Sequence, residues 1–250
     1  MPARYEVIAV EGLPEIRHGD ALGPLIVDAA RRQSTPLEAG DLLVVSQKIV
    51  SKTEGRVVRL AEVHVSPKAR AVADEIGRDP RLVQVILGES RRIVRKAKDV
   101  LIVETHHGFV CANAGVDQSN VDADTASLLP EDSDRSATRL RSDIRSLTGH
   151  DVPIIVADTF GRPWREGLVN VAVGVSGLEP IVSYLGRLDP AGHVLQATIL
   201  ALADELAAAA EPVMGKLARV PVALVRGLDW PRGEGTSRAL LRDPARDLFR

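Results

Sequence analysis

The sequence has little cysteine, few aromatic residues and almost no net charge, and each shortage excludes a class of protein. The single cysteine, Cys111, excludes an intramolecular disulfide and a cysteine-based zinc cage, and it fits a reducing cytoplasm. Acidic and basic residues nearly cancel, to a formal charge of -2, which argues against a nucleic-acid-binding surface. Aromatic residues make up 3% of the chain, so aromatic platforms that stack bases are also not expected.

Long apolar runs are missing as well. No run approaches the roughly 20 residues that span a bilayer, and the N-terminal segment MPARYEVIAV lacks the apolar stretch of a secretion signal. The 250 residues can bury a substantial core, either as a single domain over 1–250 or as two intimate subdomains. We therefore expect a cytoplasmic globular protein.

Short apolar runs alternate with helical patterns along the chain. Strands outnumber clean strand–helix–strand crossovers, which favours a mixed α+β fold over a doubly wound sheet. Capping and periodicity predict helices over 21–32, after Ser66-Pro67, after Asp79-Pro80, over 136–148 and over 195–217. Apolar runs predict strands over 5–10, 42–46, 91–97, 100–104, 152–157, 169–175 and 220–226.

Two lysines follow the expected strand 42–46. The stretch GDLLVVSQKIVSKTEGRVV places Gln47, Lys48, Ser51 and Lys52 just beyond that strand. A cation there could meet a phosphate and Gln47 could hydrogen-bond a nucleotide, although the glycines and the Lys-Ser/Thr order of a Walker loop are missing. A solvated lysine pair is the alternative interpretation.

Two carboxylates stand beside small residues at the ends of apolar runs. Asp117 lies in GFVCANAGVDQSN, and Asp158 follows an apolar strand in ADTFGRPWREG, directly before Thr159. Hard divalent cations take oxygen ligands, so two such aspartates and a hydroxyl could form a magnesium or manganese site that also uses phosphate oxygens. For Asp117 the alternative is a turn aspartate that hydrogen-bonds its own backbone. The sequence alone does not show that the two aspartates converge.

Other candidates have ordinary structural explanations. Arg162 and Arg165 could clamp an anion, or they could pack on Trp164. The pair His106-His107 is more typical of hydrogen-bonded structural residues than of acid–base catalysts. Cys111 sits among Val, Ala and Phe, which favours packing over nucleophilic chemistry. Asp204 and Glu205 are expected to face solvent or a partner subunit.

Several long motifs in a fixed order resemble the coenzyme F-420:L-glutamate ligase family, also called F-420-0:gamma-glutamyl ligases. They are GLPEI, VVSQKIVSKTEGR, GFVCANAGVDQSNV, LLPED, DTFGRPWREG, ADELAAAAEPVMGK and PVALVRG, and together they cover nearly the whole chain. The resemblance implies a family-specific fold with largely antiparallel sheets and packed helices, in an intimate homodimer. It also implies an enzyme that uses GTP and a divalent metal to join L-glutamate to a deazaflavin coenzyme precursor and to extend a gamma-linked tail.

The resemblance assigns roles to individual residues. The nucleotide would be bound by Leu13, Pro14, Glu15, Ile16, Gln47, Lys52 and Asn120, with 214–221 nearby. Asp117 and Asp158 would share the first metal and Thr159 would contact a second. The cofactors implied are Mg²⁺ or Mn²⁺, with K⁺ as a further cation. No covalent nucleophile is required, because a terminal phosphoryl transfer can activate the acceptor carboxylate as an acyl phosphate.

Two residues depart from the family pattern. Ser183 replaces an acidic residue that commonly precedes the tyrosine, and Lys216 stands where some members have a glutamine able to approach metal. Both departures bear on the ligand shell of the second metal. Two other functions remain open: a metal-dependent phosphatase or nucleotidase, and a non-catalytic GTP-binding partner of a pathway enzyme.

Overall fold

The computed structural model describes residues 4–247. A mixed five-stranded sheet forms the centre of the molecule. Its strands run in the order β1 (Glu6–Ala9), β12 (Val222–Arg226), β2 (Leu42–Ser46), β8 (Ile154–Arg162) and β9 (Arg165–Ser176). All neighbouring pairs are antiparallel except β2 and β8. The fold is therefore mixed α+β with mainly antiparallel pairing, as the sequence predicts.

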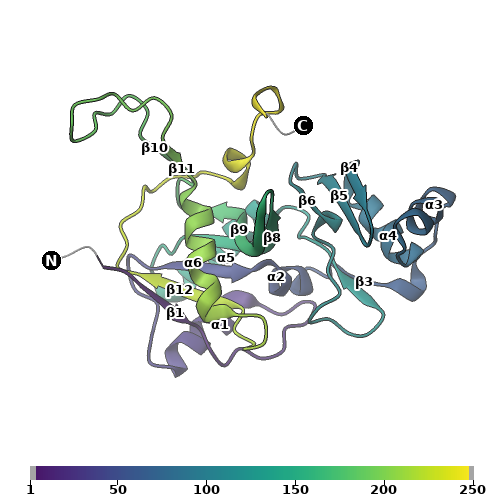
Figure 1. Cartoon of the computed structure of the whole chain (residues 1–250). Coiled ribbons are helices and arrows are strands. Elements are labelled where there is room, and N and C mark those ends of the chain that lie inside the picture. Colours follow the sequence, from purple (N-terminus) through teal and green to yellow (C-terminus); the bar gives the residue numbers. More distant parts are fainter. Residues whose placement is uncertain (1–3, 248–250) are drawn as a thin grey trace.

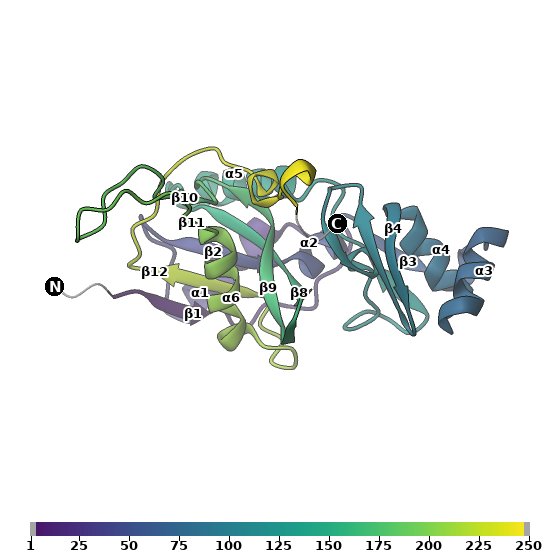
Figure 2. The same ribbon diagram turned by 45° about the horizontal axis from the view of Figure 1, so that its top comes forward.

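The central strands are apolar on both faces because both faces of the sheet are covered. In β2, Leu43 and Val45 join the core on one side, while Leu42 and Val44 join the core on the other. Alternate side chains of a strand point to opposite faces, so a strand buried on both faces reads as an unbroken apolar run. Figures 1 and 2 show α1 (Leu22–Arg32) and α5 (Ser133–Thr148) on one face and α6 (Leu202–Met214) on the other.

A smaller lobe with its own apolar core is built mainly from the residues between α2 (Gln47–Thr53) and α5. It contains α3 (Pro67–Ile76), α4 (Pro80–Gly88) and the antiparallel strands β4 (Ser90–Ala97), β5 (Val100–Thr105) and β6 (Val110–Ala112). The pair β3 (Val57–Arg59) and β7 (Thr125–Ser127) connects it to the central sheet. Short 3₁₀ turns lie at Leu60–Glu62, Asn113–Gly115, Ser237–Leu240 and Pro244–Arg246.

The predicted caps hold for the helices of the lobe. Ser66 Oγ accepts a hydrogen bond from the backbone N–H of Ala69 at 3.1 Å, and Asp79 Oδ1 accepts one from Arg81 at 2.8 Å. Gly77 ends α3 with φ of 77°, a left-handed conformation that glycine adopts without a steric penalty. At the start of α1 the Asp20 side chain, which the sequence also offers as a cap, makes no cap hydrogen bond, because its carboxylate accepts from the backbone N–H of Arg17 in the preceding turn.

The structure departs most from the predicted elements in two places. The helix expected over 195–217 is confined to α6, and the preceding residues form an arm closed by β10 (Val182–Ser183) and β11 (Ile199–Leu200). The apolar spacing that suggested a longer helix belongs partly to this arm, which extends away from the sheet in Figures 1 and 2. The strand expected over 152–157 continues as β8 beyond Asp158 to Arg162, because β9 pairs with it along its whole length.

Candidate functional site

A cavity of about 640 Å³ opens where the central sheet, the start of α2 and the end of α6 meet. Segments far apart in the sequence form its wall: the loop after β1, the β2–α2 junction, the loop 117–122, strand β8 and the segment after α6. All the residues to which the sequence assigns a nucleotide or metal role line it, namely Leu13, Pro14, Glu15, Ile16, Gln47, Lys52, Asp117, Asn120, Asp158 and Thr159.

Asp117 is held in a tight turn and also meets a cation. Its Oδ1 accepts from the backbone N–H of Ser119 at 2.9 Å, which is the local turn contact that the sequence offers as an alternative to metal binding. Its Oδ2 accepts from Lys48 Nζ at 2.6 Å and from Ser119 Oγ at 2.6 Å. Burial raises the pKa of Asp117, but the hydrogen bonds from Lys48 and Ser119 outweigh it and lower the pKa below its usual value.

Asp158 lies on β8 and lines the same cavity. Fewer hydrogen bonds offset the effect of burial on its pKa than at Asp117. Burial raises the pKa of its carboxyl group to about 6, against the backbone N–H of Thr159 and the positive charge of Lys216, which act to lower it. A carboxylate whose ionisation is disfavoured by burial is stabilised by a nearby cation. The two aspartates that the sequence leaves unconnected therefore face one cavity with opposite pKa shifts.

The two lysines are not a solvated pair. Only 14% of the Lys48 side chain and 16% of the Lys52 side chain is exposed, and each meets a carboxylate at the cavity wall. Lys52 Nζ donates to Glu15 Oε1 at 2.6 Å, and this hydrogen bond is the main reason that the pKa of Glu15 is lowered. The ion pair attaches the loop after β1 to α2, so that both segments form one wall.

A hydrogen-bonded chain at the cavity contains residues that the sequence did not single out. Lys216 Nζ donates to Thr159 Oγ1 at 2.5 Å, and Thr159 Oγ1 donates to Asn170 Oδ1 at 2.8 Å. Asn170 Nδ2 then donates to Glu211 Oε2 at 2.8 Å. Asn170 is buried in β9, and a polar residue within an apolar strand was the available signal. Ser119, which fixes Asp117, was also missed.

The remaining candidates lie elsewhere. Arg162, Arg165 and Trp164 are at the β8–β9 turn, where Arg162 donates to the carbonyl of Glu166 and Trp164 is 78% exposed. The Nε2 atoms of His106 and His107 contact backbone carbonyls. Burial raises the pKa of Cys111 to about 12, which disfavours a reactive thiolate near neutral pH.

Two further side chains, Asp204 and Ser183, do not lie where the sequence suggests. Asp204 does not face solvent, because it accepts a hydrogen bond from the backbone N–H of Ala172. Ser183 lies on β10 in the arm and is not part of the cavity wall.

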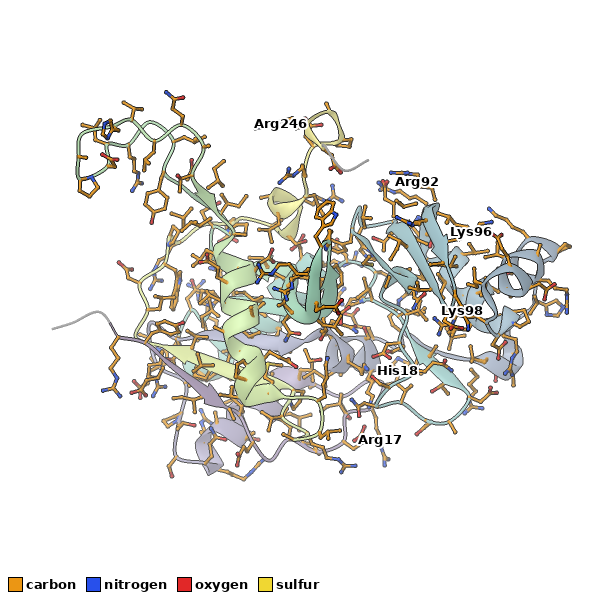
Figure 3. All side chains as sticks on the ribbon, viewed as in Figure 1. Arg17, His18, Arg92, Lys96, Lys98 and Arg246 are labelled. Carbon is orange, nitrogen blue, oxygen red and sulfur yellow. The ribbon has the colours of Figure 1, made fainter. Side chains whose placement is uncertain are left out.

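The basic residues of β4 belong to the lobe and not to the cavity. Figure 3 shows Arg92 and Lys96 along this strand, on the lobe that carries α3 and α4. Arg92 pairs with Glu104 at 2.8 Å, and Lys96 pairs with Glu75. Both basic side chains are therefore paired with carboxylates of the lobe.

Oxygen atoms that could hold a divalent cation line the cavity at Asp117, Asp158 and Thr159. Among residues 4–247 no group of three His, Cys, Asp or Glu side chains is arranged as a metal cage. Asp117 and Asp158 nevertheless offer two carboxylates to one space, and magnesium commonly uses one or two carboxylates together with substrate phosphates. At Thr159, where the resemblance implies a second cation, the Lys216 ammonium contacts the hydroxyl oxygen.

Comparison with known proteins agrees with the motifs. The model of the family described as F420-0:Gamma-glutamyl ligase matches residues 12–227. The chain is 46% identical to coenzyme F420:L-glutamate ligase of Methanothermobacter thermautotrophicus over 98% of both chains. It is 45% identical to the protein of that name from Methanopyrus kandleri, over 99% of this chain and 97% of the relative. From this match, and from the motifs that carry it, we conclude that the chain belongs to the F420-0:gamma-glutamyl ligase family.

Proposed function

We propose that this protein is a GTP-dependent ligase that adds L-glutamate to the deazaflavin coenzyme F420-0 and extends a gamma-linked glutamate tail. Membership of the family and the names of its relatives support the ligase activity. The observation that carries the proposal is that Asp117 and Asp158 line one cavity together with Gln47, Lys48 and Lys52. This combination can hold the phosphates of a nucleotide beside a cation.

Nucleotide binding would use the wall formed by α2 and the loop after β1. The ammonium groups of Lys48 and Lys52 lie at this wall and can turn from their carboxylate partners to phosphate oxygens. Asn120 lines the cavity in the loop that carries Asp117, with a φ of 53° that asparagine tolerates better than most residues. We assign GTP to this wall, as the resemblance implies.

A single divalent cation, Mg²⁺ or Mn²⁺, would be held by Asp117 and Asp158. When bound, it would neutralise charge on the nucleotide as the terminal phosphoryl group moves. Lys48 is placed to assist, because releasing Asp117 would free its ammonium for the phosphates. The resemblance also implies K⁺ as a further cation, and we assign no residue to that ion.

The reaction needs an activated acceptor because a carboxylate is a poor electrophile. Transfer of the terminal phosphoryl group of GTP to the acceptor carboxylate would form an acyl phosphate and release GDP. The glutamate amine would then attack the carbonyl carbon, inorganic phosphate would leave, and the amine would lose a proton. The buried, un-ionised thiol of Cys111 agrees with a mechanism that has no covalent enzyme intermediate.

Mass spectrometry tests the activity directly. Purified protein incubated with F420-0, GTP, Mn²⁺ and L-glutamate should produce successive increases of one glutamyl residue. Asp117→Asn should abolish the product and leave the melting temperature and circular dichroism spectrum close to those of the wild type. Product formation by this variant would contradict the assignment of the metal.

The alternatives give different outcomes in the same assay. GTP hydrolysis that needs neither glutamate nor F420-0 would indicate a phosphatase, and GTP binding without turnover would indicate a non-catalytic partner. The acyl phosphate is tested with F420-0 labelled with ¹⁸O in the acceptor carboxylate. Label should appear in the released phosphate, and its absence there would refute this intermediate.

The arm supports a homodimer, which we propose as the functional assembly in the cytoplasm. Its residues between β10 and β11 expose large apolar side chains, including Leu185 at 47%, Leu188 at 67% and Val194 at 55%. Apolar side chains gathered on one projecting segment are typical of an interaction surface. Light scattering should give twice the mass of the chain, and Leu188→Asp should reduce it to that of a monomer.

No helix in the described residues is long and apolar enough to cross a membrane.

A further inference from the structure

The hydroxyl group of Thr159 lies where a second divalent cation would be expected, and a lysine contacts it instead. Lys216 Nζ is 2.5 Å from Thr159 Oγ1, and both residues line the cavity that contains Asp117 and Asp158. A divalent cation of the size of Mg²⁺ would bind the hydroxyl oxygen at about 2 Å. The ammonium and such an ion would therefore compete for the same space and repel each other.

The hydrogen-bonded chain behind Thr159 fixes which way its hydroxyl points. The carboxylate of Glu211 can only accept, so the amide nitrogen of Asn170 faces it at 2.8 Å. The amide oxygen of Asn170 therefore faces Thr159 and accepts the hydroxyl proton at 2.8 Å. The lone pairs of the Thr159 oxygen are then directed away from Asn170, and an ammonium group is a suitable donor to them.

The backbone supports the position of Lys216. The residue follows directly after α6, and Gly215 closes that helix with its N–H donating to the carbonyl of Glu211 at 2.8 Å. Gly215 has a φ of 58°, which turns the chain back toward β8. Glu211 therefore contributes both the last link of the hydrogen-bonded chain and an anchor for the segment that carries the lysine.

We propose that the ammonium group of Lys216 replaces a second divalent cation at Thr159, and that this protein uses one divalent cation, held by Asp117 and Asp158. The inference rests on the proposed function. It gives Lys216 a role in binding the substrate. Its one hydrogen bond recorded within residues 4–247 is to Thr159, which leaves two N–H groups to donate to phosphate oxygens in the cavity.

Metal counting tests the inference without an activity assay. The protein is dialysed to equilibrium against Mn²⁺ with saturating GDP, and the excess of Mn²⁺ in the protein compartment is measured by mass spectrometry. Free Mn²⁺–GDP is the same on both sides and cancels. The wild type should bind one Mn²⁺ per chain, whereas Lys216→Gln should bind two, because it removes the charge and adds an amide oxygen at Thr159.

Arg219→Gln provides the matched control. Arg219 lines the same cavity from the same segment, but it has no hydrogen bond to Thr159 among the described residues, so this variant should still bind one Mn²⁺. Two Mn²⁺ per wild-type chain would overturn the inference, whether or not the variants fold. One Mn²⁺ in Lys216→Gln would also overturn it. No Mn²⁺ in the wild type would refute the divalent site of the proposed function and the inference with it, a result distinct from the other two.

Discussion

Lys48 Nζ lies 2.6 Å from Asp117 Oδ2 and holds a carboxylate that we assign to a metal ion. The same ammonium is also 2.6 Å from the backbone carbonyl oxygen of Ser119. Lys48 therefore neutralises Asp117, and a metal ion that binds this carboxylate must compete with the ammonium group. Lys48 is therefore expected to lower the affinity of Asp117 for a metal ion.

Removing that competitor should strengthen metal binding. Lys48→Met should increase the affinity for Mn²⁺ without nucleotide by about tenfold, because one close positive charge no longer opposes the ion. Isothermal titration calorimetry measures the change. Lys52→Met is the matched control, since Lys52 pairs with Glu15 and not with Asp117, and it should change the affinity little. Unchanged or weaker binding in Lys48→Met would contradict the prediction.

Metal binding should depend on pH through Asp158. Burial raises the pKa of this residue to about 6, so a proton competes with the metal below that pH. The affinity for Mn²⁺ should fall by about tenfold for each pH unit below 6 and should change little between pH 7 and pH 8. Titrations at several pH values check this dependence. A constant affinity between pH 5 and pH 7 would contradict the prediction, either in the raised pKa of Asp158 or in its role as a ligand.

The same pKa shift predicts the pH dependence of stability without metal. The folded-state pKa of Asp158 lies above its unfolded value, so its contribution is fully present below about pH 4 and is lost as the pH rises through about 6. At pH 7, with a chelator present, Asp158→Asn should exceed the wild type in free energy of unfolding by about 3 kcal/mol. The difference should disappear near pH 4, as measured by urea unfolding. A free energy of unfolding at pH 7 that is lower in the variant than in the wild type would contradict this prediction.

A glycine in β9 sets how closely α5 approaches the sheet. A Cβ atom at Gly174 would lie 2.6 Å from Ser133 Cβ and even closer to the backbone carbonyl of Ser133, which cannot move without shifting the start of α5. Gly174→Ala should therefore reduce the free energy of unfolding by about 3 kcal/mol or more. Gly161→Ala, in the paired strand β8, is the control, because its nearest atom would be at 3.9 Å. Equal stability of the two variants would argue against this contact.

Local signals in the sequence predicted much of the secondary structure. The strand over 42–46 matches β2, because a run buried on both faces is apolar throughout. Ser66-Pro67 and Asp79-Pro80 placed the starts of α3 and α4, because a side-chain cap and a proline act within one helical turn. The longer helix expected from residue 195 failed, because apolar spacing alone does not distinguish a buried helix face from an exposed arm.

The candidate site was predicted in its residues but not in its contacts. The motifs and the resemblance they carry pointed to Asp117, Asp158 and Thr159, and all three line one cavity. They did not indicate that Lys48 pairs with Asp117 or that Asn170 connects Thr159 to Glu211. Such contacts join segments far apart along the chain, and no local pattern encodes them.

The sequence by itself determined the family, the α+β class and the identity of the polar residues, because motifs, caps and apolar runs are local properties of the chain. Only the tertiary structure decided which charges meet. It placed the Asp158 carboxyl group where it is poorly solvated while giving Asp117 a lysine, and it placed Lys216 against Thr159. The physical reason is that burial and pairing depend on which strands become neighbours, and the pairing of β2 with β8 brings these distant segments to one wall.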